Sequence, residues 1–242
     1  VYSLGTTVVV YTVTDASGNV TTCSFTVTVE DEEAPNLECP EPFMLVLDLN
    51  CEGEIPDLQD SIEVSDNCTL GQDITYTQSP TAGDPVSGVG VRTVTITVSD
   101  SSGNSTSCEV DIEYVDETAP ELDCPDDIIV EADEECVYVL EDFTGQAIVT
   151  DNCTNSTEIT VTQDPIAGTE LEGVGEYDIT ITATDESGNS STCVFVVEII
   201  DVTDPEITCP QDIIVSTDPG ICEADVSIDI PAVSDNCELE GF

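Results

Sequence analysis

The sequence predicts an all-β protein made of tandem immunoglobulin-like β-sandwich repeats, each of about 85 residues and stapled by disulfides. Three observations lead to this prediction. The cysteines recur at a fixed period, short segments alternate apolar and polar residues, and no stretch shows sustained helical periodicity. Several short strands in each repeat are typical of a sandwich of this kind.

The repeat is defined by its cysteines. Two sets of three cysteines recur at a constant interval of about 85 residues, and the other two sets nearly match it. The first two sets are Cys23, Cys108, Cys193 and Cys39, Cys124, Cys209. This period divides the chain into the C-terminal half of a repeat at 1–33, complete repeats at 34–118 and 119–203, and the N-terminal half of a repeat at 204–242.

Two strands near the end of each repeat are the clearest. Residues 93–98 read Thr-Val-Thr-Ile-Thr-Val, and residues 108–113 alternate in the same way, so each strand has one buried and one wet face. Between them, residues 100–104 contain a Gly and an Asn that suit left-handed turn positions, which predicts an antiparallel hairpin. Aromatic residues make up only 5% of the chain and Trp is absent. Each core is therefore thin, and disulfides are needed to stabilise it.

The charge of the chain excludes several partners. There are 53 acidic residues against a single basic one, Arg92, and the formal net charge is -52. Nucleic acid and anionic membranes require a basic surface, so we expect neither as a direct partner. Such self-repulsion predicts bound counter-cations, for which calcium is the natural candidate. The alternative is a purely solvating acidic surface suited to salty water.

The cysteines also indicate the compartment and argue against catalysis. Twelve cysteines without His or a CxxC motif favour disulfides in an oxidising, extracellular or cell-surface location. The chain has no His and no Lys, and its carboxylates are spread through linkers and strand faces. We therefore expect that it is not an enzyme.

The order of motifs within a repeat resembles the HYR (hyalin repeat) family. The second complete copy reads Cys124-Pro125, Cys136, Asp-Asn-Cys at 151–153, Gly-Val-Gly at 173–175, Asp-Glu-Ser-Gly-Asn at 185–189 and finally Cys193. The likeness covers the whole chain. It implies an immunoglobulin-like extracellular module found in tandem in adhesion and matrix proteins, with no catalytic residues to carry over.

The resemblance also implies a disulfide pairing, because members of this family often lack the second and third cysteines together. Four cysteines by themselves allow three connectivities. The family implies first with fourth and second with third: Cys39–Cys108, Cys124–Cys193, Cys51–Cys68, Cys136–Cys153 and Cys222–Cys237. Cys23 and Cys209 then have no partner within the chain, and we expect them to bond another molecule or cysteines outside this sequence.

Candidate calcium ligands lie in the linkers and in two kinds of turn. Acids occur between the last strand of each repeat and the next Cys-Pro, and the Asp-x-x-Gly-Asn turn is expected at the same end of the sandwich as the incoming linker. The Asp-Asn before the third cysteine could add ligands. The alternative is that these are solvated linkers and Asx turns that cap backbone amides. The candidates are Asp15, Asn19, Asp31, Glu33, Asp66, Asn67, Asp100, Asn104, Asp116, Asp151, Asn152, Asp185, Asn189, Asp201 and Asp204.

The ends of the chain suggest self-association. Val1 aligns with Val86 and Phe242 with Asp73, so head and tail are complementary halves of one repeat. Either the sequence is a window on a longer array, or the tail of one copy completes the head of the next in a filament. We expect a structural segment of an extracellular fibre in both cases. A ligand-binding cell-surface adhesin module is the alternative, with a target that the sequence does not identify.

Overall fold

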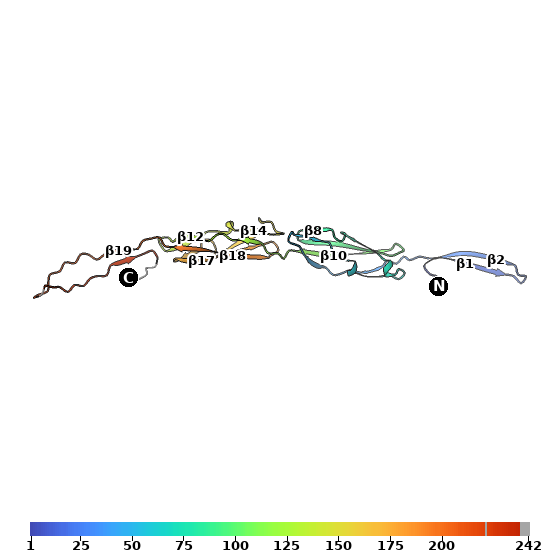
Figure 1. The fold of residues 1–242 in the computed structure, drawn as a ribbon. Helices are drawn as coiled ribbons and strands as arrows, with labels where there is room; N and C mark the ends of the chain where they lie inside the picture. The colour runs from blue at the N-terminus through green and yellow to red at the C-terminus, as the bar shows by residue number, and fades with distance from the viewer. Residues whose placement is uncertain (221, 238–242) are drawn as a thin grey trace. The chain divides into compact units, whose positions relative to one another are not determined.

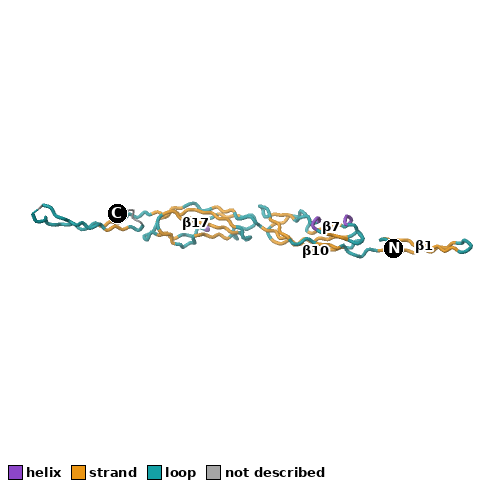
Figure 2. The backbone as a smooth tube through the Cα atoms, turned by 90° about the horizontal axis from the view of Figure 1, so that it is seen from below, coloured by secondary structure: helices purple, strands orange, loops and turns teal. Residues whose placement is uncertain are grey.

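The computed structural model describes residues 1–220 and 222–237, which form 20 strands and three short 3-10 helices (Figures 1 and 2). The predicted all-β, immunoglobulin-like architecture is confirmed. The chain divides into two compact units, Val1–Glu117 and Thr118–Phe242. None of the described helices is long and apolar enough to cross a membrane.

The first unit contains a hairpin followed by a sandwich. The hairpin pairs β1 (Gly5–Thr14) with β2 (Val20–Val29) in antiparallel fashion. The main sheet of the sandwich has the order β4-β10-β9-β7, in which β4 is parallel to β10. Its strands are β4 (Phe43–Val46), β7 (Thr75–Ser79), β9 (Gly90–Ser99) and β10 (Ser105–Val115). The remaining elements are β3 (Asn36–Glu38) paired with β6 (Glu63–Ser65), β5 (Glu52–Glu54) paired with β8 (Pro85–Ser87), and the helices η1 (Gln59–Ser61) and η2 (Gly71–Asp73).

The core of this sandwich follows the predicted alternation. Every second side chain in the second half of β9 is fully buried, and β10 supplies the facing set, while the threonines between them lie on the outer face. The buried residues on these two strands are Val94, Ile96, Val98, Val110, Ile112 and Tyr114. The two-stranded sheet β5-β8 is held against the main sheet by the Tyr114 hydroxyl of β10, which donates to the carbonyl of Glu54 in β5 at 2.7 Å.

The second unit repeats this plan. Its main sheet has the order β12-β18-β17-β15, again with the first strand parallel to its neighbour. These strands are β12 (Ile128–Glu131), β15 (Thr160–Asp164), β17 (Gly175–Thr184) and β18 (Ser190–Ile200). The other elements are β11 (Glu121–Asp123) with β14 (Ile148–Thr150), β13 (Val137–Val139) with β16 (Glu170–Glu172), η3 (Thr144–Gln146), and β19 (Glu206–Thr208) with β20 (Ala232–Ser234). The core centres on Phe143 and Phe195, whose rings meet edge to face at 5.1 Å.

Each sandwich has two distinct ends. The hairpin-turn end carries the Asp-x-x-Gly-Asn turn, at residues 100–104 or 185–189, and the glycine end carries Gly-Val-Gly, at 88–90 or 173–175. A ten-residue strand, β9 or β17, runs from one end to the other. At about 3.3 Å per residue, the two ends are about 30 Å apart.

The disulfides agree with the family pairing only in part. Cys39–Cys108 and Cys124–Cys193 are present, each closing a sandwich from its first to its fourth cysteine. The expected pairs Cys136–Cys153 and Cys222–Cys237 are wrong, because Cys136 bonds Cys237. The expected pair Cys51–Cys68 is also wrong, since Cys51 is disulfide-bonded while Cys68 is a free, exposed thiol. Cys23, Cys209 and Cys222 are likewise free and exposed.

The length of the sandwich explains the correction. The carbonyl of Cys136 accepts the N–H of Gly173 at 2.8 Å, which places the second cysteine at the glycine end. The third cysteine lies at the other end, because the next residue, Thr154, accepts the N–H of Glu186 in the hairpin turn at 3.3 Å. A disulfide requires Cα atoms within about 7 Å, so these two cysteines of one repeat cannot be joined.

Candidate metal centre

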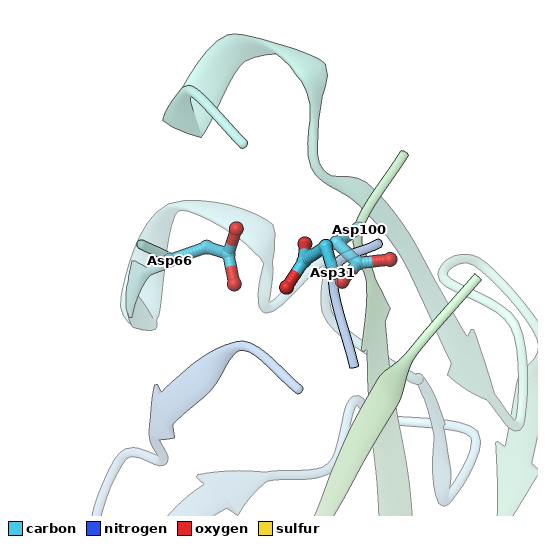
Figure 3. Close-up of side chains that lie close together, drawn as sticks. All are labelled: Asp31, Asp66 and Asp100. Carbon is cyan, nitrogen blue, oxygen red and sulfur yellow. The ribbon is translucent and has the colours of Figure 1, made fainter. Parts of the chain in front are cut away.

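Three aspartates from distant parts of the first unit converge at the hairpin-turn end of its sandwich. Asp31 follows β2 in the linker, Asp66 follows β6, and Asp100 begins the turn between β9 and β10. Each offers a carboxylate oxygen within 4.8 Å of the others (Figure 3). Two oxygens bound to the same calcium lie at most about twice the Ca–O bond length apart, or about 4.8 Å. The spacing of the cluster therefore suits one shared cation.

The turn fixes the Asp100 carboxylate in place. Its Oδ1 accepts the N–H groups of Ser102, Gly103 and Asn104 at 2.9, 2.6 and 2.8 Å, and its Oδ2 accepts the Asn104 side-chain amide at 2.8 Å. Gly103 has a φ of 98°, which only glycine adopts without strain. Burial raises the pKa of Asp100, but the hydrogen bonds from Asn104, Gly103 and Ser102 outweigh it and hold the pKa below its ordinary value. The carboxylate is thus anionic at neutral pH.

Asp31 and Asp66 each present one oxygen that lacks a hydrogen bond. Asp66 Oδ1 accepts the N–H groups of Cys68 and Thr69 at 3.0 and 2.5 Å, and Asp31 Oδ1 accepts that of Glu33 at 3.2 Å. Within the described part of the chain, the Oδ2 atoms of both aspartates are buried and have no hydrogen-bond partner. Buried carboxylate oxygens are costly when unsatisfied, and a bound cation would supply the missing partner.

No basic side chain is at hand to neutralise the cluster. Arg92, the single Lys or Arg of the chain, donates to the carbonyls of Val91 and Ser87, both at 3.1 Å, close to the glycine end of β9. The three carboxylates therefore repel one another, and because they are buried or half-buried, water screens this repulsion only in part. A hard divalent cation with oxygen ligands fits this donor set, and calcium, which accepts irregular geometry and many oxygens, fits it best.

Two of the predicted asparagines contact the acidic residues of the site through their amide nitrogens. The Asn104 amide nitrogen donates to both Asp100 Oδ2 and the carbonyl of Asp31, the latter at 3.1 Å, so Asn104 positions two members of the cluster. The Asn67 amide nitrogen donates to Glu33 Oε2 at 2.7 Å, and these two residues pair beside the cluster. These amides therefore orient carboxylates through their nitrogen atoms.

In the hairpin, the Asp15 turn has the geometry of Asp100 without the other carboxylates. Asp15 accepts the N–H groups of Ser17 and Asn19 and the Asn19 side-chain amide, and these bonds, above all that side-chain amide, lower the pKa of Asp15. Asp15 is exposed, and no acidic group joins it in a cluster among the described residues. Within the described residues, Asp15 and Asn19 therefore form a capping turn.

The second unit contains the same local arrangement. Asp151 Oδ1 accepts the N–H groups of Cys153 and Thr154 at 2.9 and 2.7 Å, and its Oδ2 is buried without a hydrogen-bond partner in the described residues. The buried Asp185 accepts the Asn189 side-chain amide at 2.9 Å, and one of its oxygens lies within 4.8 Å of one of Asp151.

The remaining candidates lie in or beside the linkers. Asp116 follows β10 and is buried, Asn152 lies in the loop that begins at Asp151, and Asp204 is exposed. Asp201 caps the N–H of Thr203 at 2.9 Å, as Asp31 caps that of Glu33.

Hydroxyl groups that the sequence reasoning missed tie the site together. Thr69 Oγ1 lies 3.0 Å from Ser101 Oγ, which joins the Asp66 loop to the Asp100 turn. Thr106 Oγ1 donates to the carbonyl of Pro35 at 2.6 Å, which holds the linker against β10. A sequence signal existed, because a hydroxyl residue and a proline recur at the equivalent positions of the next copy, Ser191 and Pro120. These two make the same bond at 2.7 Å.

The fold, with an aspartate cluster at the hairpin-turn end of the sandwich, defines a tandem array of immunoglobulin-like sandwich repeats that are crosslinked by disulfides. Residues 1–29 and 115–199 match the HYR domain. These two stretches are therefore similar to HYR domains, the family that the cysteine pattern resembles.

The chain is similar to two sea-urchin proteins. It is 30% identical over 243 residues to hyalin from Lytechinus variegatus, covering 97% of this chain and 44% of that protein. It is also 30% identical over 250 residues to hyalin from Strongylocentrotus purpuratus, covering 97% of this chain and 20% of that protein. The chain therefore spans less than half the length of either relative.

Solved structures with some likeness include cadherin ectodomains. The protocadherin gammaB4 extracellular domain has a TM-score of 0.39 at 20% identity, over 96% of this chain and 43% of that one. A fragment of mouse cadherin-23 has a TM-score of 0.33 at 16% identity, over 81% of this chain and 74% of that one. At such scores the likeness supports no inference about this chain.

Proposed function

We propose that the chain is a structural segment of an extracellular fibre or matrix, with calcium bound where each repeat receives its linker. The observation that carries this proposal is the pair of buried Oδ2 atoms of Asp31 and Asp66, which lack a hydrogen bond and lie beside the anionic Asp100. A cation there would satisfy both oxygens and remove the repulsion among three carboxylates.

Such a cation would couple the linker to the sandwich. Asp31 belongs to the segment that leads into the repeat, whereas Asp66 and Asp100 belong to loops of the sandwich itself. The Asn104 amide and the Thr106 hydroxyl already bond the linker carbonyls of Asp31 and Pro35. Calcium would add ionic bonds between the linker carboxylate and the sandwich carboxylates to these neutral contacts. The joint would then be stiffer, which is the property that a load-bearing array needs.

The three aspartates of the cluster recur in the sequence of the next repeat. Asp31, Asp66 and Asp100 recur in the next copy as Asp116, Asp151 and Asp185, and Asp201 begins the following linker. We therefore expect calcium to recur with the repeat. Disulfides belong to oxidising compartments, and extracellular calcium modules bind with dissociation constants of about 10⁻⁴ to 10⁻³ M, so both features support an extracellular location.

The same features argue against other roles. The chain offers no His or Lys for acid–base or nucleophilic chemistry, and its charge of -52 repels nucleic acid and anionic lipid. The proposed partner is further repeats of the same kind, either in a longer array or in a second copy.

A ligand-binding adhesin module is the second candidate, and one observation favours it. A hollow of about 270 Å³ lies between the stretch 41–49, one of the two stretches where the complete repeats differ most, and strands β9 and β10. It is lined by Pro42, Phe43, Met44, Val91, Asp111 and Glu113. Met44 and its counterpart in the next repeat, Ile129, are both 66% exposed. Cell-surface binding that is lost in Met44→Glu and kept in Ile129→Glu would favour this function.

The calcium proposal is tested by metal binding to the intact chain. Terbium luminescence and isothermal titration with calcium are measured for the unaltered chain, for Asp31→Asn and Asp66→Asn, and for Asp15→Asn as the matched control. The control removes a turn aspartate that belongs to no cluster of three acidic groups among the described residues. We expect each cluster variant to lose one site or to bind at least tenfold more weakly there, and the control to bind as the unaltered chain does.

Equal weakening by all three variants would mean that calcium is held only by diffuse charge. Unchanged binding in Asp31→Asn and Asp66→Asn would overturn the assignment of the site. Size-exclusion profiles of each variant with and without calcium check that the chains remain folded.

A further inference from the structure

The disulfide Cys136–Cys237 joins two successive repeats. Cys136 is the second cysteine of the repeat 119–203, and Cys237 is the third cysteine of the segment 204–242. Their Cα atoms lie 5.0 Å apart. Beside the bond, the Asn236 side-chain amide donates to the carbonyl of Asp133 at 2.9 Å, so the two loops also contact each other through a hydrogen bond.

The path of the chain explains why these two loops meet. β18 is antiparallel to β17 and ends at Ile200, next to the glycine end, where Cys136 lies. The following segment begins at that end, and its Asp235 loop carries Cys237 just after β20, which pairs with the first strand of the segment, β19. The second cysteine of one repeat therefore meets the third cysteine of the next one.

The same two loops recur with the same geometry. Cys51 and Cys136 both have a φ of 58°, both donate to the aspartate carbonyl three residues earlier, and both accept a glycine N–H, at 3.0 and 2.8 Å respectively. The third cysteines share a loop as well. The N–H groups of Cys68, Cys153 and Cys237 donate to the Oδ1 of the aspartate two residues earlier at 3.0, 2.9 and 3.0 Å.

We propose that a bond from the second cysteine of each repeat to the third cysteine of the next is the recurring crosslink of the array. The exposed thiols of Cys222 and Cys68 are then the two halves of this bond. Cys222 takes a third cysteine from a following repeat, and Cys68 takes a second cysteine from a preceding one. The recognised partner is a repeat of this same kind, and a second copy of the chain presents it.

The chemistry is thiol–disulfide exchange with a small-molecule disulfide such as oxidised glutathione. The thiolate of Cys222 attacks the oxidant, forms a mixed disulfide with one glutathione and releases the other as a thiol. The thiolate of Cys68 from the second copy then attacks the Cys222 sulfur and releases the second glutathione. Two protein thiols are oxidised, one disulfide is reduced to two thiols, and no other reactant is required.

Peptide mapping tests the bond within the chain. The oxidised protein is digested with pepsin at low pH, where exchange is suppressed, and the linked peptides are identified by mass spectrometry. We expect Cys136 in a peptide with Cys237. Cys136 linked to Cys153, or Cys51 linked to Cys68, would overturn the proposal.

Coupling between copies tests the two thiols. The chain carrying Cys23→Ser and Cys209→Ser, which removes the other two free thiols, is incubated at high concentration in a glutathione redox buffer. We expect a ladder of covalent multimers on non-reducing gels, with a Cys68–Cys222 peptide at least tenfold more abundant than either symmetric peptide. Cys68→Ser or Cys222→Ser in that background is expected to stop the ladder at the dimer.

Random oxidation gives a different result. It yields Cys68–Cys68, Cys68–Cys222 and Cys222–Cys222 peptides in statistical proportion, and this outcome would overturn the proposal, as would the absence of multimers. Calcium is not needed for either readout, so the crosslink and the metal site can fail independently.

Discussion

Gln163 on β15 is a buried side chain that holds two loops against the second sandwich. Its Oε1 accepts the N–H of Phe143 at 2.8 Å, and its Nε2 donates to the carbonyls of Glu141 and Pro165, both at 3.0 Å. The side chain is 8% exposed, so water does not readily replace these bonds. All three partners are backbone groups, which would lose their hydrogen bonds together.

The substitution Gln163→Met keeps the length of the side chain and removes all three bonds. A protein hydrogen bond contributes about 1 kcal/mol net, and more where a buried partner is left unsatisfied, so we expect the free energy of unfolding to fall by about 3 kcal/mol. For a domain of this size the Tm falls by roughly 12–24 °C. Scanning calorimetry and urea unfolding measure both quantities.

Gln146→Met is the matched control, because Gln146 lies exposed in η3 of the same sandwich. We expect it to change the free energy of unfolding by less than about 0.5 kcal/mol. A Gln163→Met protein as stable as this control would refute the reasoning, because it would show that the three bonds contribute nothing to the folded state.

Three further predictions concern other contacts. Tyr114→Phe removes the buried bond to Glu54 and is expected to lower the stability of the first sandwich by about 1–2 kcal/mol in urea unfolding. Replacing both Cys124 and Cys193 by Ser opens the disulfide that closes the second sandwich and is expected to cost about 4 kcal/mol on the chain-entropy model, again measured in urea. The Thr144 hydroxyl and N–H lower the pKa of Asp142 from 3.8, so its ionised form stabilises the fold above that pH, and the stabilisation is lost as the pH falls through the lowered pKa. Asp142→Asn is therefore expected to destabilise the protein at pH 7 but not at pH 2, and an equal effect at both would contradict the assignment.

The fold was largely predictable because its signals are local. Strand alternation in residues 93–98 and the glycine of the turn at 100–104 depend only on neighbours in the sequence, and the structure places both where expected. The cysteine period then extended these elements to the second repeat. The parallel pairing of β4 with β10 was not predicted, because it joins segments that lie far apart in the sequence and have no local signature.

The candidate site could be predicted in composition but not in detail. The linker, the hairpin turn and the Asp-Asn loop were expected at one end, and Asp31, Asp66 and Asp100 do meet there. The orientation of the Asn104 amide depends on which carboxylates surround it, which only the folded chain shows. The role of Gln163 was also missed, although Gln78 makes the equivalent bonds to Leu58 and Pro56 in the first sandwich.

The wrong disulfide pairs also arose because the pairing depends on where each cysteine loop lies in the folded sandwich. Spacing in sequence places Cys136 close to Cys153, but a sandwich about 30 Å long separates their loops. Family resemblance indicated which cysteines are lost together, and this is equally consistent with a bond between successive repeats. Only the assignment of each loop to an end of the sandwich distinguishes the two.

Thermal unfolding of the chain in calcium and in excess chelator, with solution X-ray scattering on the same samples, tests the central claim most directly. If calcium joins each linker to its sandwich, a concentration of about 100 times the dissociation constant stabilises the folded state by about 2.7 kcal/mol per site. We therefore predict a Tm higher by several degrees and a longer, stiffer particle with calcium than with chelator. Identical melting curves and identical scattering in the two conditions would contradict the account and leave disulfides and strand pairing as the sole supports of the array.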